Sequence, residues 1–464
     1  MWGTVMEASL NAADLVARMR ATFDTGRTRD IAWRRGQLEA LRRLLLEGEG
    51  RLIAAIAADF SKPAFETQVT ETRNVAWEID HALPRLSRWM RGHRASIPWA
   101  LWPGSGRVHP EPLGVALIIA PWNYPVQLLL SPLVGALAAG NCAVLKPSEL
   151  TPNTSAALAE LVSQYMDPDA VAIVPGGADA CTALLAERFD HIFFTGGSRV
   201  GRVVMEAAAK HLTPVTLELG GKSPCVVAAD ANLQIAAERI VWGKFLNAGQ
   251  TCVAPDYVLV DRMRHDALID AMAATITRFF GADPKQSPDF ARIVNERHAE
   301  RLAGYLKGGR IAAGGTVDIA QRYVAPTILT DVDVAAPVMH EEIFGPILPV
   351  LKVDGPAEAV AFINARDKPL ALYLFTSDAG VRDTIVGGTS SGGVCVNDLV
   401  VQLSAPDLPF GGVGMAGFGR YHGRAGFETF SNMKGVLTRH LWPEPPLRTV
   451  PHTAAKLRWI ERLM

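Results

Sequence analysis

Cysteine is scarce in this chain of 464 residues, and the five cysteines are widely scattered. None belongs to a CxxC pair, and no Cys/His cluster has the spacing of a zinc site. This odd and dispersed set argues against a disulfide framework and against a structural metal, and it is typical of a reducing compartment. We therefore expect a cytoplasmic protein that binds no metal.

An excess of charge of either sign is also absent, as is any long hydrophobic run. Lys and Arg number 46 against 47 Asp and Glu, a net charge of -1, which gives no indication of a nucleic-acid or anionic-membrane partner. No run of 18 or more apolar residues occurs, so the sequence predicts no integral membrane segment. Polar and charged residues interrupt positions 1–30, a pattern that does not fit a secretory signal peptide.

What is present is enough apolar sequence for large hydrophobic cores. Hydrophobic residues make up 49% of the chain and charged residues 20%, which excludes a disordered chain, and the length corresponds to two or three domains. Residues 10–60 and Glu71–Arg94 carry apolar residues at helical spacing. Prolines and glycines within Ser96–His109 then break any helix and indicate a connector or an excursion from the main body.

From Gly114 onward, short apolar strands alternate with helices. The expected strands are Val115–Ala120, Cys142–Leu145, Ala170–Val174, Ile192–Thr195 and Pro214–Leu217. Such alternation predicts an α/β fold with right-handed crossovers and a parallel sheet covered on both faces. A doubly wound, Rossmann-like nucleotide-binding domain is the natural interpretation.

A second α/β segment follows Gly220-Gly221 and extends to about Gly392-Gly393. The region Val394–Thr438 is rich in Gly and Phe and lacks long helical periodicity. We expect it to pair with the excursion at Ser96–His109 as an interaction element.

Cys252 ends the loop Gly249-Gln250-Thr251-Cys252, between a helix-like run (Leu233–Leu246) and a strand-like run (Asp256–Val260). A thiol at such a junction, with a small glycine nearby, can be reached by a ligand and could act as a nucleophile. The alternative is an inert cysteine in a hydrophobic core, the common state of any single cysteine. No histidine is evidently paired with Cys252, which argues against a Cys–His protease or amidase.

Two polar residues near expected strand ends could supply further chemistry. Glu218 lies between apolar neighbours, which should raise its pKa and suit it to act as a general base near neutral pH. Asn123, between Pro121 and Pro125, carries an amide suited to a developing oxyanion. The alternatives are a helix cap or a lone surface carboxylate for Glu218, and a turn-forming residue for Asn123.

Two further segments could bind a dinucleotide. Lys146 and Glu149 follow the second strand of the set and could hold the hydroxyls of an adenosine ribose, where Glu149 would repel a 2′-phosphate and favour NAD over NADP. Gly196 and Gly201 link a strand to a helix and would let backbone amides approach a pyrophosphate. A solvated loop is the alternative for the Lys–Glu pair, and the glycine motif differs from the usual G-x-G-x-x-G.

In order along the chain, seven segments together make the sequence resemble the aldehyde dehydrogenase superfamily. They are Pro-Trp-Asn-Tyr-Pro at 121–125, Lys-Pro-Ser-Glu at 146–149, Phe-Thr-Gly-Gly-Ser at 194–198, Leu-Glu-Leu-Gly-Gly at 217–221, Gly-Gln-Thr-Cys at 249–252, Glu-Glu-Ile-Phe-Gly-Pro at 341–346 and Pro-Phe-Gly-Gly at 409–412. The sequence of residues 205–225, with Val-Asn-Asp at 396–398 and Tyr-His-Gly at 421–423, is similar to that of class 3, which includes the fatty and aromatic aldehyde dehydrogenases.

This resemblance implies NAD(P)-dependent oxidation of a medium- or long-chain aliphatic or aromatic aldehyde to the acid, through a cysteine thiohemiacetal and thioester. Cys252 would be the nucleophile, Asn123 and the backbone N–H of Cys252 would hold the oxyanion, and Glu218 would activate the hydrolytic water. The implied cofactor is NAD, with NADP as an alternative, and the implied assembly is a homodimer. The implied cofactor-binding residues are Trp122, Lys146, Glu149, Gly196, Gly197, Ser198, Gly201, Glu342 and Phe344.

The family architecture also implies a division of the chain. The expected parts are an NAD(P)-binding domain (1–96 and 112–219), a catalytic domain (220–393), an oligomerisation element (97–111 and 394–440) and a C-terminal tail (441–464). For the tail, we expect a short helix that packs on the body or on a partner subunit, with peripheral membrane contact as the alternative.

Four positions depart from the family pattern. Gly197 and Ser198 stand where Ser and Thr are usual, Gln402 where class 3 often has His, and Ala416 where Ser is usual. These changes bear on phosphate contacts and substrate preference. Two alternatives remain at this point: an enzyme that passes the acyl group to coenzyme A, for which a water-activating Glu218 is unnecessary, and a catalytically silent binding protein on the same fold.

Overall fold

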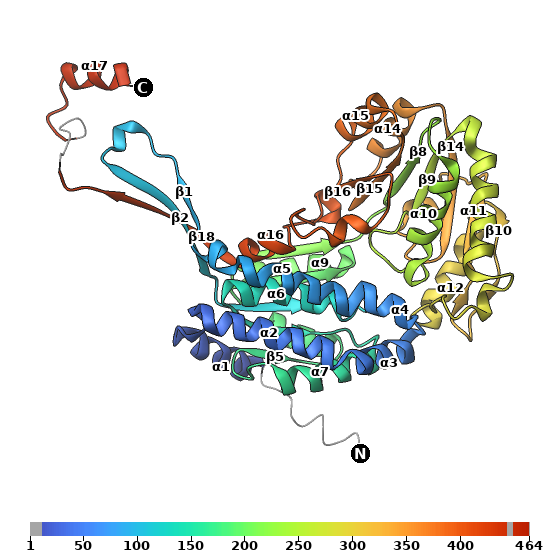
Figure 1. Cartoon of the computed structure of the whole chain (residues 1–464), viewed down its shortest axis with the longest axis horizontal. Helices are drawn as coiled ribbons and strands as arrows, with labels where there is room; N and C mark the ends of the chain where they lie inside the picture. Colours follow the sequence, from blue (N-terminus) through green and yellow to red (C-terminus); the bar gives the residue numbers. More distant parts are fainter. Residues whose placement is uncertain (1–11, 443–448, 464) are drawn as a thin grey trace.

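The computed structural model describes residues 12–442 and 449–463 (Figure 1). A six-stranded sheet, in the order β17-β7-β6-β3-β4-β5, forms the centre of the N-terminal half. Its strands β3 to β7 are parallel, and β17 pairs antiparallel with β7 at the edge. The strands are β3 (Val115–Ile119), β4 (Cys142–Lys146), β5 (Val171–Ile173), β6 (His191–Gly196), β7 (Val215–Leu219) and β17 (Gly417–Phe418).

Helices cover both faces of this sheet, because alternate side chains of each buried strand point to opposite faces. In β3, Ala116 and Ile118 pack in one hydrophobic cluster, while Val115 and Leu117 pack in another. The predicted doubly wound architecture is therefore confirmed. The first cluster includes α2 (Ile31–Glu47), α3 (Glu49–Phe60), α5 (Arg73–Met90), α6 (Gln127–Ala139), α7 (Pro152–Tyr165) and α16 (Gly423–Thr429), and the second α1 (Ala12–Asp24), α8 (Ala178–Leu185) and α9 (Ser198–Ala209). Between α3 and α5 the chain forms α4 (Ala64–Thr67) and a π-helical turn (Gln68–Thr72).

A seven-stranded sheet organises the second half of the chain, in the order β10-β13-β14-β9-β8-β15-β16. Six of its strands are parallel, and β10 is antiparallel to β13. The strands are β8 (Pro224–Val227), β9 (Tyr257–Asp261), β10 (Arg310–Ala313), β13 (Thr327–Thr330), β14 (Ile347–Val353), β15 (Ala371–Phe375) and β16 (Gly393–Val396). The longer helices of this half are α10 (Leu233–Phe245), α11 (His265–Phe280), α12 (Glu296–Tyr305), α14 (Pro356–Asn364) and α15 (Ala379–Gly388).

The expected excursion is an arm that projects from the body (Figure 1). Strands β1 (His93–Ala95) and β2 (Gly104–Pro112) form a hairpin, and β18 (Ser431–Arg439) pairs with β2 along nine residues. The C-terminal region therefore pairs with the excursion, as predicted. Within the predicted 394–440 element, however, β16 and β17 belong to the two large sheets, so β18 alone joins the arm.

The last described element, α17 (Ala454–Leu463), lies beyond the end of the arm and away from the body (Figure 1). Leu457 and Trp459 are more than half exposed, so the helix does not pack on its own body. Across residues 12–442 and 449–463, no helix is both long and apolar enough to cross a bilayer.

Candidate active site

A cavity of about 200 Å³ lies at the carboxyl ends of β3, β6 and β7. Strand order reverses between β3 and β6, because β4 and β5 follow on one side and β6 and β7 on the other. Such a switch point is where open α/β sheets bind ligands. Three segments predicted from the sequence as functional meet there: Pro121–Asn123, Thr195–Gly197 and Glu218–Gly220.

Cys252 also lines this cavity, from the loop between α10 and β9. A second cavity of about 200 Å³, lined mainly by apolar residues, reaches the same cysteine. The two cavities share only Cys252 and Leu128. Cys252 therefore stands where a mainly apolar tunnel meets a pocket that holds carboxylates, which is an arrangement for bringing two ligands to one thiol. The second cavity is lined by Val69, Thr70, Asn74, Tyr124, Gln127, Leu128, Trp242, Leu246, Thr251, Cys252, Val253, Val400, Val401, Leu403, Ser404, Phe410 and Tyr421.

Glu218 is buried on β7, and neither carboxylate oxygen has a hydrogen-bond partner among the described residues. Burial raises its pKa well above the usual range, and Arg420 offsets this only in part. The strand is fixed by β17, whose Gly417 is the register partner of Glu218. A side chain at Gly417 would meet Leu217 O at 1.9 Å, so glycine permits this close pairing. The arrangement holds a carboxyl group that can take up and release a proton.

The Cys252 thiol is half-buried, and its pKa is raised to about 12. Burial is the main cause, followed by the carboxyl groups of Glu342 and Glu218. Asn123 is buried beside it, and its Nδ2 donates a hydrogen bond to Gln250 O at 3.0 Å. This bond uses one of the two amide N–H groups and orients the amide toward the cysteine loop.

Glu342, Phe344 and Trp122 line the first cavity. Burial raises the pKa of Glu342 to about 8, and its Oε1 has no partner within the described ranges. The Trp122 and Phe344 rings meet edge to face with centroids 5.3 Å apart. The cavity thus has an aromatic wall and carboxyl oxygens that are free to bind a hydroxyl group.

The other predicted cofactor residues lie around the same edge of the sheet. Lys146 is buried at the end of β4, where its Nζ donates to Pro147 O at 2.6 Å and burial lowers its pKa. Glu149 is exposed nearby. Ser198 begins α9, and Gly201 in its first turn packs against Leu219, where a side chain would clash at 2.8 Å. Gly196, Gly197 and Ser198 therefore stand at a helix N-terminus with little side-chain cover, which suits an anionic group.

Some residues of the two cavities were missed from the sequence. His298 and Arg301, on α12, line the first cavity, where the His298 ring lies 5.6 Å from Trp122. Burial lowers the pKa of His298 to about 4, so the imidazole is neutral at physiological pH. Tyr421 lines the second cavity beside Cys252. His298 and Arg301 stand in no motif, and only their shared helical face, three residues apart, could have pointed to them.

Comparison with known proteins identifies the fold as that of a family of aldehyde-oxidising enzymes. Residues 1–436 match the model of the aldehyde dehydrogenase family, and the chain belongs to that family. Rat aldehyde dehydrogenase family 3 member A2 is 49% identical over 446 residues, which cover 96% of this chain and 92% of the relative. A dog relative named "aldehyde dehydrogenase, dimeric NADP-preferring" is 47% identical over 446 residues, 96% of this chain and 98% of the relative.

A solved structure gives the same result for the whole fold. AldH of Staphylococcus aureus, in a substrate-bound state, superposes with a TM-score of 0.94 at 41% identity and covers 97% of this chain and 98% of that chain. The expected class 3 resemblance is confirmed by the family 3 relatives. The chain is an NAD(P)-dependent oxidoreductase acting on aldehydes. Neither acyl transfer to coenzyme A nor a catalytically silent binding protein is favoured.

The residues present fit a nicotinamide dinucleotide. Five polar oxygen atoms of the first cavity lack partners among the described residues: Asn123 Oδ1, Thr195 Oγ1, Glu342 Oε1 and both carboxylate oxygens of Glu218. The cavity borders a larger cleft of about 620 Å³, with which it shares Gly220 and Glu342, and which extends past Ser198 on α9. Hydroxyl-binding carboxylates next to an uncovered helix N-terminus are the groups that a ribose and a pyrophosphate need.

Proposed function

We propose that this enzyme oxidises medium- or long-chain aliphatic or aromatic aldehydes to acids through a thioester on Cys252. The observation that carries the proposal is the meeting of two cavities at this thiol. The second cavity is bounded by Tyr124, Trp242 and Phe410, and a narrow apolar space of this kind suits a hydrocarbon chain or an aromatic ring. The first cavity offers the carboxyl groups of Glu218 and Glu342.

In the proposed reaction, the Cys252 thiol releases its proton to solvent, and Sγ attacks the carbonyl carbon of the aldehyde. The Asn123 amide and the backbone N–H of Cys252 stabilise the resulting oxyanion, a contribution worth about 3 kcal/mol per donor in other enzymes. NAD(P), when bound, would supply the acceptor for the hydride that leaves this carbon. A thioester remains on Sγ, and Glu218 removes a proton from the water that attacks it. The carboxylic acid then leaves, and Sγ regains its proton.

For cofactor binding, we propose Glu342 for the nicotinamide ribose, with Phe344 and Trp122 as the wall beside the ring. Lys146 and Glu149 would hold the adenosine ribose. The pyrophosphate would lie over the helix N-terminus formed by Gly196, Gly197, Ser198 and Gly201. Glu149 favours NAD, and NADP is a second substrate for the same site; the dog relative is named NADP-preferring.

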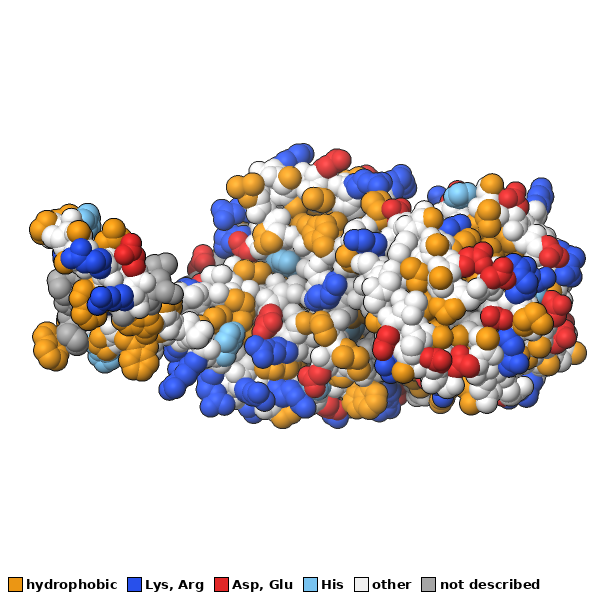
Figure 2. Space-filling model, turned by 90° about the horizontal axis from the view of Figure 1, so that it is seen from above, with side chains coloured by type: hydrophobic (Ala, Val, Ile, Leu, Met, Phe, Trp, Pro, Cys, Tyr) orange, Lys and Arg blue, Asp and Glu red, His pale blue; other side chains and the backbone are white. Residues whose placement is uncertain are grey.

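We also propose a homodimer built through the arm. Strand β18 is an edge of the three-stranded sheet, and such an edge presents unpaired backbone groups to a partner. Figure 2 shows hydrophobic side chains gathered on this part of the molecule. The most exposed large apolar residues of the arm and tail are Trp99, Trp102, Leu437, Leu441, Trp442, Val450, Leu457 and Trp459. A second copy would cover them, and we place α17 on the partner subunit.

The remaining proposals concern the parts of the chain and its compartment. We propose that 1–96 and 112–219 bind the dinucleotide, that 220–393 supply the cysteine, and that 97–111 with β18 serve oligomerisation. All five cysteines are free thiols, which agrees with a reducing compartment, and we propose the cytoplasm.

Initial rates of NADH formation with a panel of aliphatic aldehydes of increasing chain length and with benzaldehyde derivatives test the substrate proposal. We expect kcat/KM to rise from short to medium chains, by up to about 15-fold for each added pair of buried methylenes, because each buried CH₂ contributes about 0.8 kcal/mol. The same rates with NADP test the cofactor preference. Turnover that required added coenzyme A would replace hydrolysis with acyl transfer, and a preference for acetaldehyde would contradict the apolar tunnel.

A further inference from the structure

Three consecutive residues ahead of the nucleophile have left-handed backbone conformations. They are Asn247 (φ 54°), Ala248 (φ 52°) and Gly249 (φ 73°), and all are buried. Residues other than glycine adopt this region rarely, and such strain persists only where the surroundings hold it. A side chain at Gly249 would meet Gly345 O at 2.3 Å. The turn that presents Cys252 therefore depends on contacts from outside the loop.

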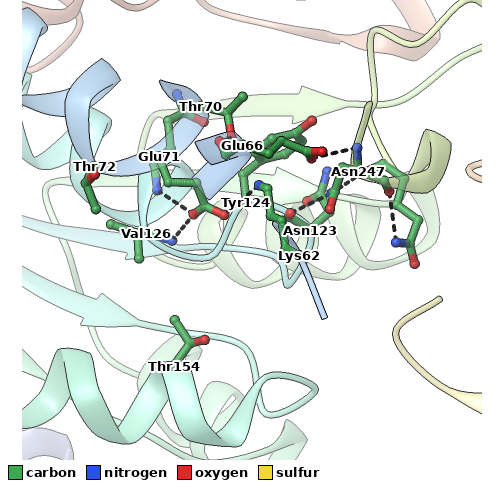
Figure 3. Close-up of polar contacts among 12 residues, drawn as sticks. Lys62, Glu66, Thr70, Glu71, Thr72, Asn123, Tyr124, Val126, Thr154 and Asn247 are labelled. Carbon is green, nitrogen blue, oxygen red and sulfur yellow. Dashed lines mark hydrogen bonds and ion pairs between the residues drawn. The ribbon is translucent and has the colours of Figure 1, made fainter. Parts of the chain in front are cut away.

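Glu66, on the short helix α4, makes one such contact. Its Oε1 accepts a hydrogen bond from the Asn247 N–H at 2.7 Å (Figure 3). Burial raises the pKa of Glu66 to about 7, and its ionised form makes one of the stronger kinds of hydrogen bond to a backbone donor. Glu66 is 181 residues away from Asn247 in the chain, and it lines neither cavity. The bond thus ties the N-terminal helical layer to the cysteine loop.

The same turn also holds the oxyanion donor. Asn247 Nδ2 donates to Asn123 O at 2.8 Å and to Gln250 O at 3.2 Å. Asn123 Nδ2 donates to the same Gln250 oxygen. A displacement of Asn247 would therefore move the Asn123 backbone and the residue two positions before Cys252 together.

A second connection from the N-terminal layer reaches the loop beside the cysteine. Lys62 and Glu71 form a fully buried ion pair of 2.8 Å, and Glu71 Oε2 accepts the Val126 N–H at 2.8 Å (Figure 3). Lys62 Nζ lies 3.9 Å from the centre of the Tyr124 ring, whose hydroxyl is 2.7 Å from Thr251 Oγ1. Glu71 belongs to the π-helical turn of this layer, an irregularity that is frequent at functional sites.

We propose that Glu66 is a positioning residue for aldehyde oxidation: through Asn247 it sets the placement of the Asn123 amide relative to the Cys252 thiol. The Lys62–Glu71 pair holds the segment that follows Asn123, because Glu71 binds the Val126 N–H and Lys62 packs on the Tyr124 ring. Glu66 itself touches neither substrate nor cofactor. This inference rests on the roles proposed above for Cys252 and Asn123.

The test is the rate at which Cys252 is acylated in the full-length enzyme, measured by rapid quench with NAD and a saturating aldehyde, with the acylated residue identified by mass spectrometry. We expect Glu66→Ala to slow acylation by about 10- to 100-fold, because small displacements of reacting groups cost rates of this order, with the aldehyde KM within twofold. Glu66→Gln keeps an oxygen acceptor for the Asn247 N–H and should restore the rate to within about threefold of the wild type.

Glu160→Ala is the matched control, because Glu160 is an exposed glutamate that pairs with Arg51 on the surface, and its acylation rate should equal that of the wild type. If Glu66→Ala does not fold, Glu66→Asp shortens the side chain by one methylene and moves the acceptor away from the Asn247 N–H. Its Cys252 acylation rate is then compared with that of the wild type. Wild-type acylation rates in the Ala or Asp variant, per correctly folded molecule, would overturn the positioning role. An unacylated Cys252 in the wild type would instead overturn the proposed nucleophile.

Discussion

At the scale of single residues, burial favours the protonated forms of the two central groups of the site. Burial and neighbouring carboxyl groups raise the pKa of Cys252 to about 12, and burial raises that of Glu218 well above the usual range. A protonated thiol is a weak nucleophile, and a protonated carboxyl group is no base. Each residue therefore acts only after it has lost a proton, and the two residues act in different steps that kinetic measurements can distinguish.

Substitution of the two residues should stop the reaction at different points. Cys252→Ala should lower turnover by at least about 10⁴-fold, because no thioester can form. Glu218→Gln should leave one burst of NADH per active site and then reduce the steady-state rate by about 10²- to 10⁴-fold. Stopped-flow absorbance of NADH distinguishes the two. A Glu218→Gln enzyme without a burst would mean that Glu218 is needed for the first step, which would contradict a role in hydrolysis only.

The raised pKa of Glu218 also predicts a pH dependence with a definite sign. The ionised form is the base, so the steady-state rate should rise with pH as Glu218 ionises, by up to tenfold per pH unit below its pKa. Stability should change in the opposite direction, because the unfolded chain releases this proton at an ordinary carboxyl pKa while the folded chain retains it. Between the ordinary carboxyl pKa and the raised pKa of the folded chain, the free energy of unfolding should fall less steeply with pH in Glu218→Gln than in the wild type.

At the scale of elements, the buried Lys62–Glu71 pair joins the π-helical turn to the N-terminus of α6. Both side chains are fully buried, and removal of one partner leaves an uncompensated charge that costs about 3–5 kcal/mol. We expect Lys62→Met and Glu71→Gln each to lower the unfolding free energy by this order. The double variant should lose less than the sum of the two, as measured by urea unfolding of the full chain. Strict additivity would mean that the pair does not interact.

Periodic elements could be predicted from the sequence, because their pattern is local. Strands β3 and β5 of the six-stranded sheet are wholly apolar, and Cys252 does lie between a helix and a strand, α10 and β9, as expected. The seven motifs identified the family for the same reason, because each is a contiguous run of residues that can be recognised without knowledge of the fold.

Individual contacts between distant segments could not be predicted in this way. The pairing of the C-terminal region with the excursion was expected, but the strand that makes it was not, because the largely exposed β18 has no apolar alternation that would have marked a strand. The left-handed Asn247 and Ala248 are not glycines, so nothing local indicated the turn. Glu66 is an ordinary helical glutamate in the sequence, and its importance depends on a hydrogen bond formed only in the folded chain.

At the scale of the whole molecule, the arm exposes apolar side chains and the free edge of β18, which a second copy of the chain would cover. Leu437→Asp on β18 should shift the enzyme from twice the chain mass of 50.0 kDa to a single chain, because a charge at an apolar interface is costly to bury. Light scattering coupled to size exclusion measures this. Met263→Asp, at an exposed position on the body, is the control. A wild-type enzyme that is monomeric at micromolar concentration would contradict the proposed dimer.

The two cavities that meet at Cys252 have almost separate linings, and this has a kinetic and an evolutionary consequence. A blocker lodged in the apolar tunnel should compete with the aldehyde while leaving dinucleotide affinity unchanged, and an analogue of the adenosine end should do the reverse. Changes that widen or narrow the tunnel can likewise accumulate without disturbing the redox half of the site. Descendants of such an enzyme can diversify in the aldehydes they accept while keeping a common way of binding the coenzyme.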